Sequence, residues 1–85
     1  MIIVTGGAGF IGSNLVYGLN KIKQKNIIIC DTANSVLKKN YLKKAKYKKI
    51  ISPSNFFYFL EKNKKKIKYI FHLGAITATT SVDFQ

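Results

Sequence analysis

The sequence feature that most constrains the fold is a cluster of glycines directly after a short β-branched run. The chain begins MIIVTGGAGFIGSNL, in which residues 6, 7, 9 and 12 are glycine, whereas all 85 residues together contain 6 glycines. Each glycine costs backbone entropy, so this density indicates a backbone that turns tightly and approaches another group closely. Residues 2–5 are therefore predicted to form a buried strand that ends in a glycine turn.

Apolar runs and helical periodicity alternate along the rest of the chain. Strands are predicted at residues 2–5, 26–31, 50–51 and 67–73, and helices at 10–23, 35–49 and from Ser52-Pro53 into the lysines at 62–66. The predicted buried faces are Ile11, Leu15, Leu19 and Ile22 in the first helix, Leu37, Tyr41 and Ala45 in the second, and Phe56, Phe59 and Leu60 in the third. This alternation predicts an α/β fold, in which helices flank a parallel sheet that is buried on both faces.

The glycine turn has the spacing of a dinucleotide-binding loop. Residues 7–12 satisfy G-x-G-x-x-G between a predicted strand and a predicted helix, which is the context that this motif requires. Gly6 would permit the turn, Gly9 would let a pyrophosphate approach the backbone, and Gly12 would let the helix pack closely on the strand. Asp31 ends the next predicted strand, about 20 residues further on, where an acid that binds a ribose hydroxyl is expected. The pattern predicts an anion bound at the N-terminus of the first helix.

The net charge is +12, and the basic residues are all lysine. Proteins that bind nucleic acid usually include arginine, whose planar fork binds phosphate and guanine with two hydrogen bonds. We therefore interpret the lysine excess as a bias toward AT-rich codons and do not expect nucleic acid as a partner. The alternative from another functional class is a small basic nucleic-acid-binding protein that uses residues 38–49, with Tyr41 and Tyr47 as stacking groups.

The sequence gives no sign of a membrane segment or a metal site. No apolar run approaches the roughly 18 residues of a membrane span, and no basic segment of a secretory signal precedes the first strand. Cys30 and His72 are the only residues of their types. An intrachain disulfide is thus excluded, and we expect a buried Cys30, a structural His72, no bound metal and a cytoplasmic protein.

Two motifs resemble the extended short-chain dehydrogenase/reductase superfamily, which contains the NAD-dependent epimerases and dehydratases. They are TGGAGFIGSN at residues 5–14 and FHLGAITATTSVD at residues 71–83. The FH-x-GA-x-x-x-TT-x-x-D pattern is most similar to the ADP-L-glycero-D-manno-heptose 6-epimerases of lipopolysaccharide core synthesis, with another nucleotide-sugar epimerase or dehydratase as the alternative. The resemblance implies that residues 1–85 form the N-terminal half of a Rossmann-type doubly wound parallel sheet. Such a unit is a partial NAD(P)-binding domain of about four strands, with the substrate domain absent.

The same resemblance implies a cofactor site for NADP, with NAD as the alternative. The implied binding residues are Gly6, Gly9, Phe10, Ile11, Gly12, Asp31, Thr32, Lys38, Leu73, Gly74, Ala75, Ile76 and Thr77. Phe10 and Ile11 would cover the pyrophosphate, and Asp31 and Thr32 would bind the adenosine ribose. Lys38 would meet a 2′-phosphate, and residues 73–77 would follow the cofactor toward the nicotinamide. Lys48 and Lys49 stand where the family usually has an acidic residue near the adenine.

Enzymes of this superfamily use a Tyr-x-x-x-Lys pair, in which the tyrosine is the acid/base. The spacing occurs here at Tyr17–Lys21 and Tyr58–Lys62, both on helices that precede the last predicted strand. We interpret both pairs as surface helix residues because catalytic geometry takes precedence over residue type. The sequence therefore predicts no catalytic residue and no activity for these residues alone. For the full-length family, the resemblance implies an ADP-heptose substrate and an oligomer.

Overall fold

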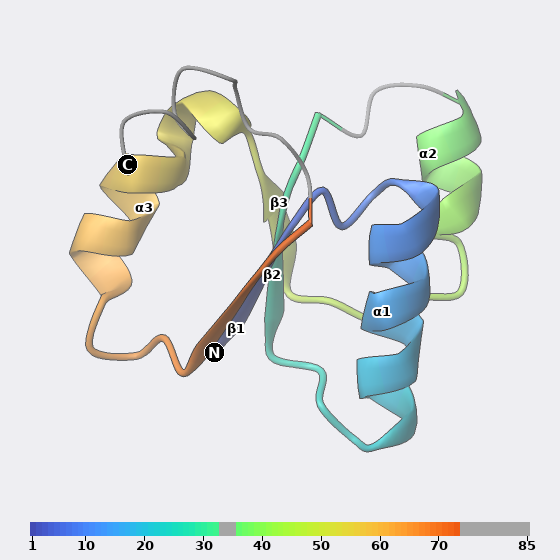
Figure 1. Cartoon of the computed structure of the whole chain (residues 1–85), viewed down its shortest axis with the longest axis horizontal. Helices are drawn as coiled ribbons and strands as arrows, with labels where there is room; N and C mark the ends of the chain where they lie inside the picture. Colours follow the sequence, from blue (N-terminus) through green and yellow to red (C-terminus); the bar gives the residue numbers. More distant parts are fainter. Residues whose placement is uncertain (33–35, 74–85) are drawn as a thin grey trace.

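Four parallel strands form one sheet, in the order β3-β2-β1-β4 (Figure 1). A computed structural model of the chain describes residues 1–32 and 36–73. The strands are β1 (Ile2–Thr5), β2 (Ile27–Cys30), β3 (Lys49–Ile51) and β4 (Tyr69–His72). The strand order reverses direction at β1, which lies between β2 and β4. This is the arrangement of the first half of a doubly wound sheet, so the predicted fold class is confirmed.

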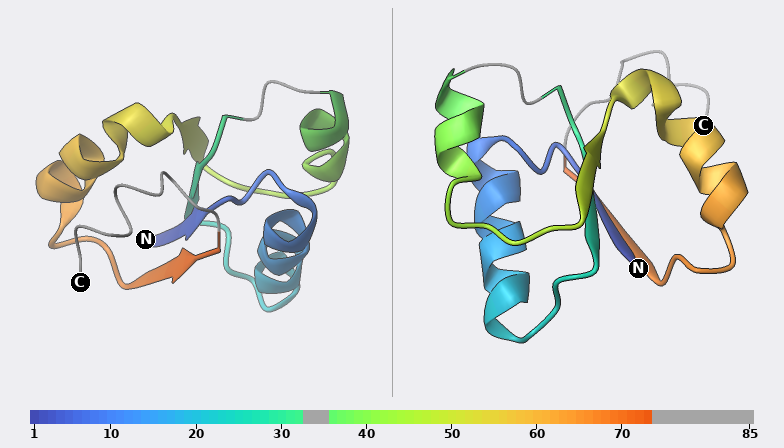
Figure 2. Two further views of the ribbon diagram at one scale, coloured as in Figure 1. Left: turned by 45° about the horizontal axis from the view of Figure 1, so that its top comes forward. Right: turned by 180° about the vertical axis from the view of Figure 1, so that it is seen from behind.

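Helices cover both faces of the sheet. They are α1 (Phe10–Lys21), α2 (Val36–Tyr41), the 3-10 turn η1 (Pro53–Asn55) and α3 (Phe56–Asn63). Helices α1 and α2 lie on one face and α3 lies on the other (Figure 2). Pro53 begins η1 directly after Ser52, as the Ser-Pro pair predicts. The Ser52 hydroxyl does not cap the helix, and its oxygen instead lies 3.0 Å from that of Ser54.

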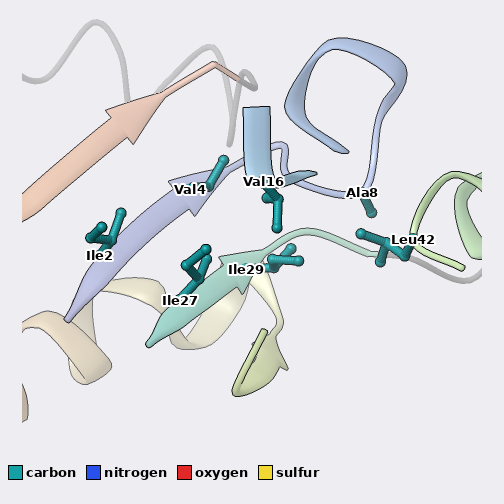
Figure 3. Close-up of a cluster of buried hydrophobic side chains, with 7 residues drawn as sticks. All are labelled: Ile2, Val4, Ala8, Val16, Ile27, Ile29 and Leu42. Atoms are coloured by element: carbon teal, nitrogen blue, oxygen red, sulfur yellow. The ribbon is translucent and has the colours of Figure 1, made fainter. Parts of the chain in front are cut away.

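The two central strands contribute side chains to a separate core on each face of the sheet. The core beneath α1 consists of Ile2, Val4, Ala8, Val16, Ile27, Ile29 and Leu42 (Figure 3). The core beneath α3 consists of Ile3, Ile28, Cys30 and Phe56. Successive residues of a strand point to opposite faces, so a continuous β-branched run supplies both cores. The predicted burial of Cys30 is confirmed, because its exposed fraction is 1%.

The buried face of α1 differs from the predicted one. Ile11 and Ile22 are 71% and 66% exposed, whereas Gly12, Ser13 and Val16 are buried. The missing side chain at Gly12 lets the helix backbone approach the preceding turn, and this contact decides which residues face the sheet. Leu15 and Leu19 of the predicted face flank that line of contact and pack against the core.

Helix α2 is much shorter than the predicted helix at 35–49. It ends at Tyr41, after which Leu42 is buried and hydrogen-bonded turns follow to Ala45. Leu37, which the helical periodicity predicts on the buried face, is 64% exposed. Lysines at 38, 39, 43 and 44 repel one another at helical spacing, and this disfavours a longer helix.

Strand β4 is more exposed than a strand that is buried on both faces. Tyr69 and Ile70 are 62% and 45% exposed, and Leu73 just beyond the strand is 47% exposed. Within the described residues β4 pairs only with β1, so one of its edges has no strand beside it. The prediction of two-sided burial is therefore correct for β1 and β2 and wrong for β4.

We expect opposite effects from alanine at two glycines of α1. A Cβ at Gly12 would overlap the Gly6 carbonyl and lie 2.8 Å from the Gly7 Cα, whereas a Cβ at Gly18 would meet nothing within 4 Å. Gly12→Ala should lower the free energy of unfolding by about 1–3 kcal/mol through overpacking. Gly18→Ala should raise it by about 0.5–1 kcal/mol through helix propensity. Urea denaturation measures both changes, and a Gly12→Ala protein as stable as wild type would contradict the close contact.

Candidate functional site

The glycine loop turns the chain from β1 into α1 at the carboxyl edge of the sheet. Gly6 has a φ of 72°, a left-handed conformation that favours glycine. Its N–H donates to the Cys30 carbonyl over 2.8 Å, and its own carbonyl accepts from the Gly9 N–H over 3.1 Å. The loop is thus bonded to the end of β2 as well as to itself.

Gly7 is a structural position that the sequence analysis did not single out. A Cβ there would lie 2.9 Å from Cγ2 of Ile29 and 3.2 Å from the Val4 carbonyl oxygen. The loop therefore needs a residue without a side chain at this point in order to lie against β2. The consecutive pair Gly6-Gly7 was the available signal, since only the first glycine is explained by the turn.

Gly9 has a different role, because its surroundings on the protein side are open. Its backbone is extended, with φ −78° and ψ 177°, which any residue adopts, and a Cβ would meet only the Gly6 oxygen at 3.5 Å. Among the described residues, no side chain caps the N-terminus of α1, which begins here. The backbone N–H groups of the first turn are available to an anion, which the helix dipole also favours. The small residue at Gly9 leaves the approach to them open.

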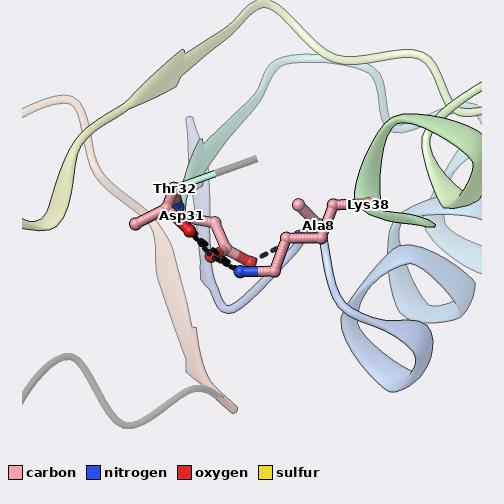
Figure 4. Close-up of polar contacts among 4 residues, drawn as sticks. All are labelled: Ala8, Asp31, Thr32 and Lys38. Atoms are coloured by element: carbon pink, nitrogen blue, oxygen red, sulfur yellow. Dashed lines mark hydrogen bonds and ion pairs between the residues drawn. The ribbon is translucent and has the colours of Figure 1, made fainter. Parts of the chain in front are cut away.

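Asp31 follows β2 and joins the glycine loop (Figure 4). Its Oδ2 accepts from the Ala8 N–H over 3.0 Å, and its Oδ1 accepts from the Thr32 N–H over 2.7 Å. Lys38 on α2 donates to the same Oδ1 over 2.8 Å and to the Thr32 hydroxyl over 2.9 Å. Asp31, which the sequence places at the end of the second strand, thus meets the glycine loop at the carboxyl edge, and Lys38 joins them there.

The surroundings of Asp31 keep its carboxylate charged. Burial by itself raises the pKa of Asp31, but hydrogen bonds from Lys38, Thr32 and Ala8 and the lysine charge outweigh it, so the pKa lies below 3.8. Burial first, and the charge of Asp31 second, raise the pKa of the neighbouring Cys30 thiol to about 11. The thiol is therefore protonated at neutral pH and is a poor nucleophile.

The carboxyl end of β4 lies beside that of β1. The Leu73 N–H donates to the Thr5 carbonyl over 3.2 Å, and the buried Thr5 hydroxyl oxygen lies 3.1 Å from Nδ1 of His72. Leu73 thus stands at the same edge as the glycine loop. The other expected residues of this segment, Gly74, Ala75, Ile76 and Thr77, lie outside the described residues.

Both Tyr-x-x-x-Lys spacings lie on exposed helix surface toward the amino edge. The Lys21 ammonium lies 4.8 Å from the centre of the Tyr17 ring, and the Lys62 ammonium lies 5.4 Å from that of Tyr58. Tyr17 is 43% exposed and Tyr58 is 66% exposed. Their interpretation as surface residues agrees with this placement.

Lys48 and Lys49 lie at the amino end of β3, away from the glycine loop. Their expected position near an adenine is therefore wrong, because β3 starts at Lys49 and its carboxyl end is two residues later. The residues at that carboxyl end are Ser52 and Ser54, which the sequence analysis read only as a helix start.

Two further observations concern the parts of the chain that the structure describes. Within residues 1–32 and 36–73, no group of three histidine, cysteine or acidic side chains gathers at metal-binding distance. None of the helices in these ranges combines the length and apolar character that a membrane crossing needs.

The Asp31 contacts predict a pH dependence of stability. Folding lowers the pKa of Asp31, so its ionised carboxylate stabilises the folded protein. This stabilisation is complete above the pKa of the unfolded state, which is about 4, and is lost as the pH falls through the lower pKa of the folded state. Wild type should lose stability below about pH 4 by this route, and Asp31→Asn should lack this part of the acid dependence. Thermal unfolding across acidic pH tests this, with Glu61→Gln as the control because Glu61 forms only an exposed ion pair. Parallel pH profiles for wild type and Asp31→Asn would disprove it.

Comparison with known proteins identifies relatives along nearly the whole chain. The ADP-L-glycero-D-manno-heptose-6-epimerase of Brachyspira hyodysenteriae is 40% identical over 86 residues, covering 98% of this chain and 27% of that protein. The proteins of the same name from Fusobacterium nucleatum and Alkalilimnicola ehrlichii are 40% and 39% identical, covering 98% of this chain and 26% and 27% of their own length. The chain therefore spans about a quarter of the relatives that it matches.

A family-level match agrees with these relatives. Residues 2–85 match the model of the NAD dependent epimerase/dehydratase family. The matched residues include the glycine loop and Asp31. The chain belongs to the NAD dependent epimerase/dehydratase family.

Proposed function

We propose that residues 1–85 are the N-terminal, cofactor-binding part of an ADP-L-glycero-D-manno-heptose 6-epimerase, a partial NAD(P)-binding domain. The observation that carries this proposal is the bond from the Ala8 N–H to Asp31, which joins the acid of β2 to the open N-terminus of α1. An anion site beside a fixed carboxylate is what a dinucleotide requires, since it presents a pyrophosphate next to a ribose diol.

The pyrophosphate would lie on the first turn of α1. Backbone N–H groups there would donate to its oxygens, and the open side of Gly9 would admit it without a steric clash. Phe10 and Ile11 are 64% and 71% exposed at this point, so they are available to cover the bound group. The described donors and the free space at Gly9 therefore fit a dinucleotide.

Lys38 would decide between NADP and NAD. A carboxylate at the end of β2 attracts ribose hydroxyls but repels a 2′-phosphate, whereas a lysine beside it offsets that repulsion. Lys38 is bonded to both Asp31 and Thr32, which are the residues proposed to hold the ribose. Its ammonium could turn toward a 2′-phosphate while staying near Asp31, and this supports NADP as the preferred cofactor and NAD as the weaker one.

The chemistry proposed for the whole enzyme is epimerisation of a nucleotide sugar. When bound, the nicotinamide supplies a transient hydride acceptor for C6 of the heptose. The described residues contribute binding and orientation, because both Tyr-x-x-x-Lys pairs stand toward the amino edge, away from Gly9. We propose that residues 1–85 alone do not epimerise ADP-heptose. For the full-length enzyme we propose a cytoplasmic, oligomeric protein of lipopolysaccharide precursor synthesis.

Titration of NADP and NAD into the purified chain should separate the roles of Gly9 and Lys38. Gly9→Val should lose both cofactors, because its branched side chain would occupy the space over the α1 N-terminus while its extended backbone remains unstrained. Lys38→Gln should lower the affinity for NADP by about tenfold, a typical value for one charge-assisted contact, and leave the affinity for NAD nearly unchanged. Isothermal titration calorimetry provides both affinities.

Gly18→Val is the matched control, because it adds the same side chain to the same helix where nothing lies within 4 Å. Circular dichroism should show all three variants folded. If Gly9→Val bound NADP as well as wild type, the glycine loop would not be the phosphate site. An equal loss of NAD and NADP in Lys38→Gln would remove the proposed role in cofactor choice.

Expression of residues 1–85 tests the proposal about activity and stability. The chain should show no conversion of ADP-D-glycero-D-manno-heptose above background, with or without NADP. It should also tend to associate, because no strand of the described residues pairs with the outer edge of β4, beside Tyr69 and Ile70. Analytical ultracentrifugation and a coupled heptose assay measure these two properties. Turnover would contradict the first expectation, and a monomer at high concentration would contradict the second.

A further inference from the structure

The lysines are distributed unevenly between the two edges of the sheet. All of them except Lys38 and Lys39 lie in the loops that lead into β2, β3 and β4 or in the residues next to these loops: Lys21, Lys23 and Lys25; Lys43, Lys44, Lys46, Lys48 and Lys49; and Lys62, Lys64, Lys65, Lys66 and Lys68. In a parallel sheet these return loops run toward the amino ends of the strands, at the lower edge in Figure 1. Asp31 lies at the other edge, and Glu61 is paired with Lys64. The amino-edge side is therefore strongly positive.

This grouping keeps only part of the basic cluster at residues 38–49 that the sequence suggested, the lysines from Lys43 to Lys49, and adds those of two other loops. Lys38 is bonded to Asp31 at the carboxyl edge, and the Tyr41 ring packs edge-on against Phe10 at 5.7 Å. The strongly basic surface is instead built from three loops that are distant in sequence. The lysine-rich face of the protein therefore lies at the amino edge.

Two hollows lie on this basic face. One, of about 490 Å³, lies between α1 and the loop before β3 and is lined by Tyr17, Asn20 and five lysines. The other, of about 600 Å³, lies beside α3 and includes Tyr58, Phe59, Lys48, Lys49, Lys62 and Lys66 in its lining. Each hollow thus combines an exposed tyrosine with several ammonium groups.

The two tyrosines have the same local arrangement. Tyr17 and Tyr58 each stand one helical turn before a lysine whose ammonium lies over the ring, at 4.8 Å for Lys21 and 5.4 Å for Lys62. Both members of each pair line one of the two hollows, Tyr17 and Lys21 the first and Tyr58 and Lys62 the second. These are the two Tyr-x-x-x-Lys spacings that the proposed cofactor site does not use.

We propose that the amino edge of this sheet binds single-stranded nucleic acid. Lys21 and Lys62 turn from the tyrosine rings to adjacent phosphates, and Tyr17 and Tyr58 then stack on bases. The surrounding lysines neutralise further phosphates. Single strands are favoured over an anionic membrane or a duplex because the rings stand in hollows, where an unpaired base fits and a flat surface does not. The lysine ammonium is a compact charge and lacks the planar fork with which arginine recognises a base. We therefore expect binding without a sequence preference. The surface is separate from the carboxyl edge, so it does not depend on the cofactor proposal.

Fluorescence anisotropy with the full chain and a labelled thymidine oligonucleotide of about 20 residues tests this. Binding should weaken with salt, with a log–log slope of about 0.7 for each phosphate neutralised. Tyr17→Ala/Tyr58→Ala keeps the charge and should bind at least about tenfold more weakly, whereas Tyr17→Phe/Tyr58→Phe should bind like wild type. Lys44→Gln/Lys46→Gln should reduce the salt slope by about 1.4, and Lys39→Gln, which lines neither of the two hollows, should leave it unchanged.

Several outcomes would overturn the proposal. They are no binding at about 50 mM salt, equal binding by the double alanine variant with intact folding, or stronger binding to a duplex of the same length. Stronger binding to vesicles of phosphatidylserine and phosphatidylcholine would assign the face to a membrane instead. If saturating NADP displaced the oligonucleotide, binding at the carboxyl edge would replace the proposed surface.

Discussion

The contact between the α1 backbone at Gly12 and the Gly6 carbonyl is the constraint on which the rest of the site depends. Any side chain at Gly12 would push the helix away from the turn. Because the helix lies this close, Val16 reaches the core one turn later and the N-terminus of α1 opens beside β2. Gly6 and Gly7 contribute the turn and the approach to Ile29. Gly6, Gly7 and Gly12 therefore act as one packing unit, whereas Gly9 in the same loop faces open space.

The carboxyl edge and the amino edge of the sheet differ in chemistry because they are connected differently. Loops that leave the carboxyl ends carry the glycines, Asp31 and Ser52, which are short polar or flexible residues. Loops that return to the amino ends carry nearly all of the lysines. Within the carboxyl edge, Lys38 neutralises Asp31, and this keeps the pKa of the carboxyl low and its position fixed. One small sheet thus has a carboxyl edge with a paired carboxylate and an amino edge that is rich in lysine.

The central strands of the sheet are better covered than the edge strand β4. β1 and β2 are covered by α1 on one side and α3 on the other, and their side chains are almost fully buried. Among residues 1–32 and 36–73, β4 has one neighbouring strand and exposes Tyr69 and Ile70. The relatives are about four times longer than this chain, and a doubly wound sheet usually continues beyond the fourth strand. The stability of β4 in the sheet consequently depends on what packs against its edge opposite β1.

The sequence by itself determined the strand–turn–helix start, the parallel α/β class and the position of Asp31, because β-branched runs and glycine spacing are local signals. Which strands are central was decided by the tertiary structure, which places β1 and β2 between β3 and β4. Tertiary structure decided the buried face of α1, because the close contact at Gly12 buries Gly12, Ser13 and Val16, while Leu15 and Leu19 of the predicted face stay against the core and Ile11 and Ile22 are exposed. It also decided where α2 ends, that Lys48 and Lys49 lie at the amino edge, and that Lys38 pairs with Asp31. Each of these depends on which residues come together in space, and spacing along the chain does not specify that.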